Sequence, residues 1–333
     1  MEHVWPKLRS WCGSLGLQFR VVDMRWGVTS EVTDGHQTLD VCRREIKRCR
    51  EKSLGPCFVH LATKKYGWRP LPVTVPTAEF KVLRKSCDFT LVQTDTPFFR
   101  ELGLSKAEEL LEKWYKIDED VQPAVYRLVP ISHVTGQKKD QELNRRIFDD
   151  VQLQLQRLMR AAVAKAALSG ELKEPGWEDK WRISLTHDEV QEALADVDRA
   201  ALFEREVGGL KDGVVPADLV SAGLEATDWL DVGDEESVAL NGRCLEEAKT
   251  MGHFEQYSLA FKPVVAGGAF DRTTAFDNTD VARVCEKIHA YVKRKITDDL
   301  RSQPLADALS QEVGSQPVES PSLTRFGVGL LPL

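Results

Sequence analysis

Apolar residues near the start of the chain recur with two periods, one typical of strands and one typical of a helix. Residues 17–22 form a short apolar run, and residues 57–62 form another, which predicts two buried strands. Between them, residues 38–51 carry apolar side chains three and four positions apart, which predicts an amphipathic helix. Strand, helix and strand form a βαβ unit, so we expect Phe19–Asp23 and Phe58–Ala62 to be adjacent parallel strands.

The pattern changes beyond residue 135, and four segments are predicted. Residues 1–135 form an α/β domain, in which a parallel sheet is flanked by helices. Residues 136–176 hold a long amphipathic helix, at 140–169, and a linker. Residues 177–300 form a second α/β region, and residues 301–333 read as a disordered tail rich in Ser, Pro and Gln. The elements expected in the second region are helices at 187–198, 236–251 and 278–300, with Asn278 as N-cap, an extended run at 201–207 and a strand at 257–262.

The amino-acid composition limits which binding partners and which cellular compartment the sequence predicts. The net charge of −7 gives no electrostatic reason to expect nucleic acid. No apolar run approaches membrane-spanning length, so we expect no membrane segment. The seven scattered cysteines favour reduced thiols and a cytoplasmic protein. Neither the cysteines nor the seven histidines show the spacing of a zinc site, so we expect no metal.

Polar side chains follow both strands of the predicted unit. Since the carboxyl ends of parallel strands meet at one edge of a sheet, such side chains can converge on one cleft. An ion pair of Arg25 with Asp23 or Glu45 is then expected. The alternative is an Asp23–Arg25 surface pair, with Trp26 covering the core. The residues predicted to line the cleft are Asp23, Arg25, Trp26, Glu45, Tyr66 and Glu79.

Four blocks in this order resemble a known family: DMRWGVTSEVT, LDVCRREI, FVHLATKKYGWRP and PTAEF. They are similar to the N-terminal TIR-like region of NACHT and WD repeat proteins, and the telomerase-associated protein of the vault particle carries a similar block. Weaker agreement covers residues 112–119, 125–131 and 183–190. The resemblance implies a TIR- or flavodoxin-like sheet, ahead of a nucleotide-dependent NACHT domain and a propeller. In the family a strand precedes the first helix. This chain opens in that helix at Val4–Trp11, so we expect the first strand to be missing.

The resemblance also implies a candidate catalytic residue. TIR enzymes use one glutamate near the start of the helix after the third strand, and PTAEF places Glu79 there. A carboxylate at that position would hold the ribose hydroxyls of NAD and stabilise positive charge as the glycosidic bond breaks. The alternative is structural, because an acid in a helix's first turn is stabilised by about 0.3–1 kcal/mol from the dipole. Thr186–Glu189 and Ser105–Glu108 similarly fit capping boxes.

Taken together, the pattern and the resemblance favour an interaction and regulatory module that is non-catalytic and needs no cofactor. Its expected partners are proteins, homotypic ones among them, with neither nucleic acid nor membrane. One alternative is a TIR-type NAD glycohydrolase that uses Glu79, with NAD as its cofactor. A second alternative is a truncated product that competes with the full-length protein for assembly partners.

Overall fold

A computed structural model covers the chain and describes residues 4–23, 30–135, 141–208, 210, 217–221, 223–262, 276–302 and 325–328. The chain divides into two compact units that interleave along the sequence. The first unit comprises residues 1–27, 42–67 and 186–333, and the second comprises residues 28–41 and 68–185. Among the described residues, the first unit contains a two-stranded sheet, a three-stranded sheet and two hydrophobic clusters, and the second contains a three-stranded sheet and one hydrophobic cluster.

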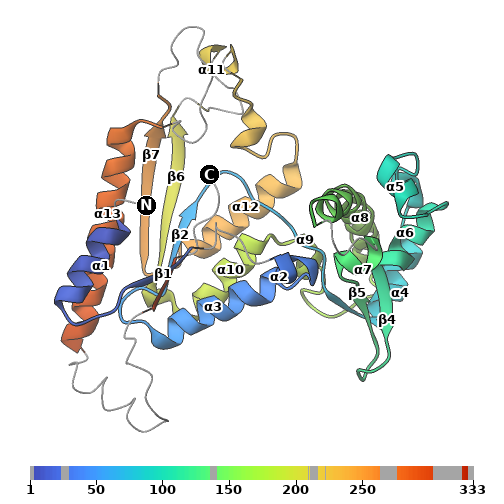
Figure 1. The fold of residues 1–333 in the computed structure, drawn as a ribbon, viewed down its shortest axis with the longest axis horizontal. Helices are drawn as coiled ribbons and strands as arrows, with labels where there is room; N and C mark the ends of the chain where they lie inside the picture. The colour runs from blue at the N-terminus through green and yellow to red at the C-terminus, as the bar shows by residue number, and fades with distance from the viewer. Residues whose placement is uncertain are drawn as a thin grey trace. The chain divides into compact units, whose positions relative to one another are not determined.

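A parallel three-stranded sheet forms the centre of the first unit (Figure 1). Its strands are β2 (Phe58–Ala62), β6 (Ala200–Gly208) and β7 (His253–Ala260), in the order β2-β6-β7. Phe58 pairs with Ala200, and Ala201 pairs with His253. Because successive side chains on a strand point to opposite faces, the apolar residues at the start of β6 pack into two hydrophobic clusters, one on each face. Ala201 and Phe203 join one hydrophobic cluster, and Ala200 and Leu202 join the other.

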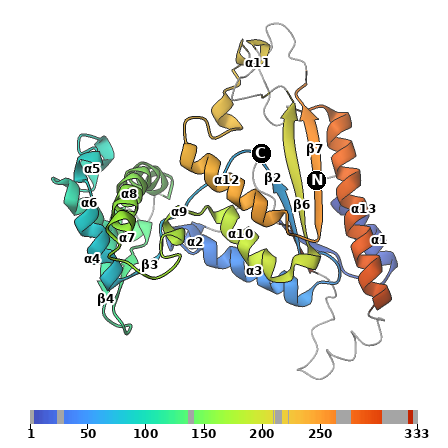
Figure 2. The same ribbon diagram turned by 180° about the vertical axis from the view of Figure 1, so that it is seen from behind.

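Helices cover both faces of this sheet, as the front and back views in Figures 1 and 2 show. One face packs against α1 (Trp5–Ser14) and α13 (Asn278–Ser302), through residues such as Leu8 and Ile288. The other packs against α3 (Thr38–Lys52), α10 (Leu185–Ala193) and α12 (Glu235–Ala248). A parallel sheet buried on both faces by helices defines the α/β class, as the sequence predicted.

The predicted pairing of Phe19–Asp23 with Phe58–Ala62 is wrong. Strand β1 (Arg20–Asp23) pairs in parallel with β8 (Arg325–Val328), from Arg20↔Arg325 to Asp23↔Val328, in a sheet separate from that of β2. Strand β8 lies beside β2 as well. A βαβ connection fixes the direction of its two strands but leaves room for another strand between them, as in doubly wound sheets. The strand beside β1 comes from the segment predicted as a disordered tail.

Most later elements lie near their predicted positions. The long helix is α8 (Gln141–Ser169), and the extended run at 201–207 is β6. The predicted N-cap Asn278 is off by one residue. The carboxylate of Asp277 accepts a hydrogen bond from the backbone N–H of Thr279 at 2.8 Å, so Asp277 caps α13. Shorter elements of the first unit are η3 (Leu194–Arg199), α11 (Ala217–Ser221) and η4 (Ala226–Asp228).

The second unit combines helices with an antiparallel sheet. The strands β3 (Thr74–Pro76), β5 (Val125–Leu128) and β4 (Tyr115–Asp118) follow the order β3-β5-β4. This arrangement differs from the parallel sheet that the sequence predicted throughout residues 1–135. Its helices are α2 (Ser30–Asp34), α4 (Thr77–Ser86), η2 (Phe89–Leu91), α5 (Pro97–Glu101), α6 (Ala107–Trp114), α7 (Ile131–Thr135), α8 and α9 (Asp179–Arg182).

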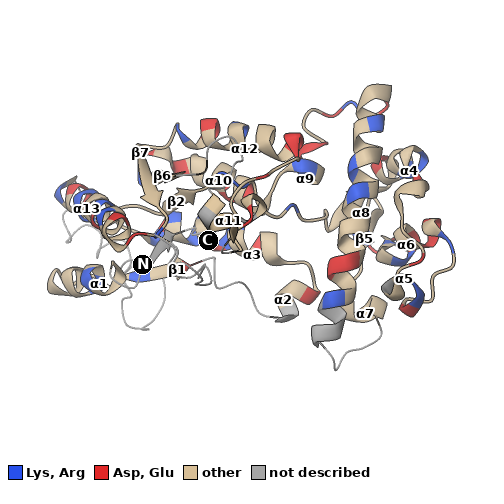
Figure 3. Ribbon diagram, turned by 90° about the horizontal axis from the view of Figure 1, so that it is seen from above, with Lys and Arg blue, Asp and Glu red and all other residues tan. Residues whose placement is uncertain are grey.

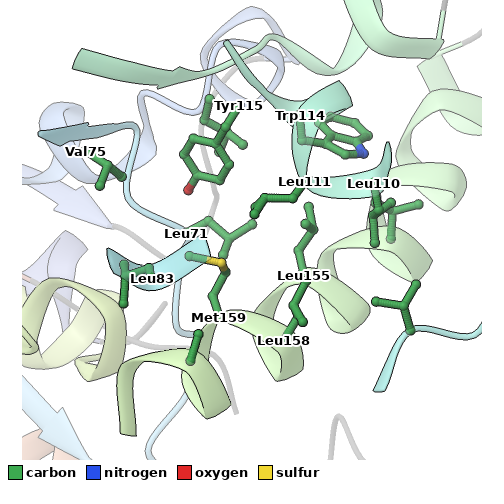
Figure 4. Packing of buried hydrophobic residues seen from close by; sticks show 14 of the residues in the cluster. Leu71, Val75, Leu83, Leu110, Leu111, Trp114, Tyr115, Leu155, Leu158 and Met159 are labelled. Carbon is green, nitrogen blue, oxygen red and sulfur yellow. The ribbon is translucent and has the colours of Figure 1, made fainter. Parts of the chain in front are cut away.

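Helix α8 organises the core of this unit. Leu155 and Leu158 of α8 face Leu110 and Leu111 of α6, and all four are fully or almost fully buried (Figure 4). Lys and Arg are mixed with Asp and Glu along α8 and α13 (Figure 3). Among the helices that the structure describes, none has an apolar stretch long enough to cross a membrane.

Shortening a core residue of α8 tests this packing. Leu155 is 0% exposed, so Leu155→Ala should lower the free energy of unfolding by about 2–5 kcal/mol, through lost burial and the cavity left behind. Leu153, on the same helix, is 56% exposed, and Leu153→Ala should stay within about 0.5 kcal/mol of the parent. Urea unfolding measures both variants. An equal loss of unfolding free energy in the two variants would show that the side of α8 that carries Leu155 is not buried.

Candidate functional site

Glu79, the candidate catalytic residue, lies in the first turn of α4 and is 6% exposed. Its Oε2 accepts a hydrogen bond from Lys180 Nζ at 2.6 Å, within an ion pair. Its Oε1 accepts one from the indole Nε1 of Trp181 at 2.7 Å. Both partners belong to α9, and Trp181 is itself buried. The two carboxylate oxygens therefore join α4 to α9.

The Glu79 carboxylate also acts on a nearby tyrosine. Tyr115 is buried and packs against Trp181, with ring centroids 6.4 Å apart. Burial raises the pKa of Tyr115 well above its ordinary value, and the negative charge of Glu79 adds to that shift. The phenol keeps its proton and donates it to the backbone carbonyl of Pro72 at 2.7 Å. The surroundings of Glu79 are thus an indole, a phenol and one ammonium group.

The other predicted cleft residues have different surroundings. Asp23 ends β1, and the carboxylate of Glu45 on α3 accepts a hydrogen bond from Arg48 at 2.6 Å. Tyr66 follows β2 and is 2% exposed. Arg25 and Trp26 lie outside the described residues, as does any ion pair of Arg25. Asp23, Glu45 and Tyr66 belong to the first unit and Glu79 to the second, so their convergence on one cleft stays a prediction.

A buried polar cluster that the sequence did not predict lies on α10. Helix α10 begins at Leu185, so Thr186 is a helical residue rather than an N-cap, and the capping box predicted for Thr186 and Glu189 is wrong. The run is polar at four consecutive positions, which cover all sides of a helix. Some of these side chains must then face the core, although the pattern does not show which. The buried residues are Thr186, His187, Asp188 and Glu189.

His187 links three segments of the first unit. It is 0% exposed, and its Nδ1 lies 2.7 Å from the hydroxyl of Tyr66. Its Nε2 lies 3.0 Å from Oε2 of Glu247 on α12. Glu247 also accepts hydrogen bonds from Gln191 and Arg243, at 3.3 and 3.1 Å. Burial raises the pKa of Glu247, but these hydrogen bonds, that of His187 first among them, outweigh it, and the net shift is downward.

Phenol, imidazole and carboxylate in a row are an arrangement that can relay a proton. Here both ring nitrogens of His187 are engaged and the ring is sealed from solvent. The backbone N–H of Tyr66 donates to Asp231 at 2.6 Å, which ties the same loop to the segment after β6. The chain of contacts therefore fixes the loop after β2 against α10 and α12.

Two further contacts join α3 to α10: Arg43 with Asp188, and Cys42 with Glu189. They differ in whether the carboxylate oxygens have hydrogen-bond partners. Arg43 binds the buried carboxylate of Asp188 with two nitrogens, Nε donating at 2.7 Å. Glu189 is 1% exposed, and its Oε1 has no hydrogen-bond partner among the described residues. Burial raises the pKa of Glu189 to about 7; the Cys42 thiol opposes this shift and the charge of Asp188 adds to it. Glu189 is thus a buried acid poised to titrate near neutrality.

The described residues hold no group of three or more His, Cys, Asp and Glu side chains that could bind a metal ion. A cavity of about 470 Å³ lies along the β4–β5 hairpin, and one of about 300 Å³ lies beside β7. Glu79, Tyr66 and His187 line neither of them. Hydrogen bonds within the fold engage the side chains of Glu79, Tyr66 and His187.

The fold and these clusters define an α/β protein with a helix-covered parallel sheet, and sequence comparison adds its relatives. The chain is homologous to NACHT and WD repeat proteins, at about 28% identity over about 58% of its length. Human NACHT and WD repeat domain-containing protein 2 is 28% identical over 200 residues, which cover 58% of this chain and 11% of that protein. Mouse NACHT domain- and WD repeat-containing protein 1 is 32% identical over 126 residues, 38% of this chain and 7% of the relative. The human form of the latter is 27% identical over 207 residues.

The matched part of this chain thus spans about a tenth of the length of these relatives. No family model matches the chain. No solved structure matches it either.

Removing the Glu79 carboxylate tests its structural contacts. Glu79→Ala should lower the free energy of unfolding by about 1–3 kcal/mol, because the buried indole N–H of Trp181 loses its acceptor. Glu79→Gln, which keeps an acceptor, should cost less. The control is Glu112→Ala, since Glu112 pairs with Arg84 at a surface where both side chains are about half exposed. Chemical denaturation measures all three. A Glu79→Ala variant as stable as the control would contradict the assignment.

Titrating the protein tests Glu189. With an ordinary pKa of 4.5 and a folded value of about 7, folded Glu189 holds its proton where the unfolded chain loses it. Stability should therefore fall as pH rises from 4.5 to 7, by about 3 kcal/mol from this residue, and then level off. Glu189→Gln should flatten that slope. Glu192→Gln, on the same helix but paired with Arg50, should not. Unfolding measured between pH 4 and 9 would show the two profiles, and matching slopes would refute the prediction.

Proposed function

We propose that this chain is a non-catalytic interaction and regulatory region of a NACHT and WD repeat type signalling protein. Homology to two such proteins, and the small share of each that this chain matches, support a role as one region of a larger assembly. We propose that it acts in the cytoplasm through protein partners, homotypic ones among them, and needs neither a cofactor nor nucleic acid. We also propose that its first unit is TIR-like, which the parallel sheet with helices on both faces supports.

The observation that carries the non-catalytic proposal is the state of Glu79. A carboxylate that stabilises a developing positive charge must face the substrate and lie within hydrogen-bond reach of it. Both oxygens of Glu79 are instead bound to Lys180 and Trp181, and the side chain is buried. The ammonium group of Lys180 already balances the negative charge. Any substrate would have to displace two charge-assisted hydrogen bonds to reach it.

The alternative, an NAD glycohydrolase, requires more than an acid in a helix's first turn. The ribose must be oriented and water excluded, and misplacement by about 1 Å can cost about a hundredfold in rate. Neither cavity described beside β7 or along the β4–β5 hairpin includes Glu79. The competing-product alternative makes the same prediction about NAD as the module does, since it is also non-catalytic.

Incubating the purified protein with NAD distinguishes an enzyme from an interaction module. We expect no release of nicotinamide above that of a protein-free sample, because the Glu79 carboxylate is occupied. Chromatographic detection of nicotinamide, at protein concentrations high enough to detect very slow turnover, measures this. The matched variants are Glu79→Gln and Glu112→Gln, which remove a buried and a surface carboxylate of the same unit.

Release that disappears in Glu79→Gln and persists in Glu112→Gln would overturn the proposal and favour the glycohydrolase. Release that is equal in both variants would indicate a contaminating enzyme and would leave Glu79 without a catalytic role. The concentration dependence of the sedimentation coefficient of the same preparation reports on homotypic contacts. A coefficient that stays at the monomer value at all concentrations would exclude them for the isolated chain.

A further inference from the structure

Arg205 is a buried cation in the carboxyl half of β6, and it is 5% exposed. Its Nε has no hydrogen-bond partner, and no carboxylate pairs with it among the residues that the structure describes. Other arginines of the same unit have such a partner: Arg43 binds Asp188, Arg50 binds Glu192 and Arg199 binds Asp196. A buried charge without a counter-ion is strongly disfavoured. Hydrophobic packing alone therefore does not explain why a charged residue is buried at this position.

Two aromatic rings form the walls around its guanidinium group. The central carbon of the group lies 5.6 Å from the ring centroid of Trp229 and 5.5 Å from that of Phe276. The two rings meet edge to face, with centroids 5.2 Å apart. Such cation–π contacts hold the cation in place and offset part of its desolvation. They supply no hydrogen-bond acceptor in the plane of the guanidinium.

Trp229 has an unused donor as well. It is 5% exposed, and its indole Nε1 has no hydrogen-bond partner within the described part of the chain. Arg205 and Trp229 thus present two unpartnered N–H donors from side chains in contact. A cation or a donor group would satisfy neither. An oxyanion would satisfy both, since its oxygens accept hydrogen bonds and its charge balances the guanidinium.

The position of the pair in the fold fits a ligand site. Strand β6 is the middle strand of the parallel sheet, and ligands of open α/β sheets bind beyond the carboxyl ends of the strands. Trp229 comes from the segment that follows β6, directly after η4. Tyr257, the neighbour of Arg205 on β7, lines the cavity of about 300 Å³ beside that strand. Arg205, Trp229 and Phe276, which come from separate segments, do not line this cavity themselves, and Tyr257 stands between it and Arg205 in the sheet.

We propose that Arg205 and Trp229 form a binding site for a small oxyanion, with Phe276 as its apolar wall. The ligand accepts hydrogen bonds from the guanidinium and from the indole N–H. A carboxylate matches the site best, because one guanidinium balances one negative charge and binds the two oxygens side by side. This site is independent of Glu79, which belongs to the other unit.

Titration with acetate, and separately with inorganic phosphate, tests the site in the full chain, with chloride used to keep the ionic strength constant. The readouts are the nitrogen–proton resonance of the Trp229 indole and the melting temperature. We expect a saturable shift of that resonance and a melting temperature several degrees higher at saturation. The anion that saturates at the lower concentration identifies the chemistry of the ligand.

Two variants and one matched control give the test its specificity. Arg205→Met removes the charge and should weaken binding at least tenfold. Without anion it should melt no lower than the parent, because it removes a buried unpaired charge. Trp229→Phe keeps the ring, removes the donor and should also weaken binding. Trp114→Phe is the control, since Trp114 is buried in the second unit with an equally unpartnered Nε1, but binding there should not change.

Shifts that grow linearly with anion, or that chloride reproduces, would overturn the proposal. So would saturable binding that Arg205→Met leaves unchanged. If Arg205→Met fails to fold, Trp229→Phe decides alone, since unchanged binding in that variant would remove the indole from the site. None of these readouts depends on cleavage of NAD, so failure here is distinguishable from failure of the proposed function.

Discussion

The burial of β6 on both faces is the constraint on which the first unit depends. Residues Ala200–Phe203 are 0% exposed, and they alternate between two hydrophobic clusters. A parallel strand in this position has no polar face to offer to solvent. The buried polar side chains of this strand, Glu204 and Arg205, therefore need partners that replace water. Glu204 accepts a hydrogen bond from Lys64 at 2.8 Å, whereas the contacts that the structure describes for the Arg205 guanidinium are with the rings of Trp229 and Phe276.

The same constraint explains why α10 carries buried polar residues. This helix covers the sheet with Val190 and Ala193, so the residues of its first turn come close to the loop after β2. Two of these polar residues have partners on other segments of the unit: His187 with Tyr66 and Glu247, and Asp188 with Arg43. Such networks fix geometry strongly when fully satisfied, because the interior weakens screening. The polar cluster thus fixes three segments that are far apart in the sequence.

The sequence predicted the positions of helices and strands better than it predicted which segments and side chains contact one another. Strand β2 and helices α3, α8 and α13 follow from apolar spacing, because burial of one face is a local property of the sequence. The partner of β1 is a strand from residues 325–328, and no local pattern encodes so distant a pairing. The surroundings of Glu79 were equally hidden, since its partners Lys180 and Trp181 lie a hundred residues away in the chain. Arg205 was not singled out, and Glu189 was predicted as part of a capping box rather than as a buried acid, because burial of a single charge leaves no periodic signal.

Satisfied and unsatisfied buried groups lead to different conclusions about function. Glu79 and His187 are chemically versatile, but each has its hydrogen-bonding atoms taken up within the fold, and that is what a structural role requires. Glu189 can avoid carrying an unpaired buried charge by keeping its proton, because burial favours the neutral form of an acid. Arg205 cannot become neutral in this way, since a guanidinium stays protonated throughout the pH range in which proteins are studied. Arg205 has neither a carboxylate partner among the described residues nor an accessible neutral form, and this combination is why we propose a ligand as its partner.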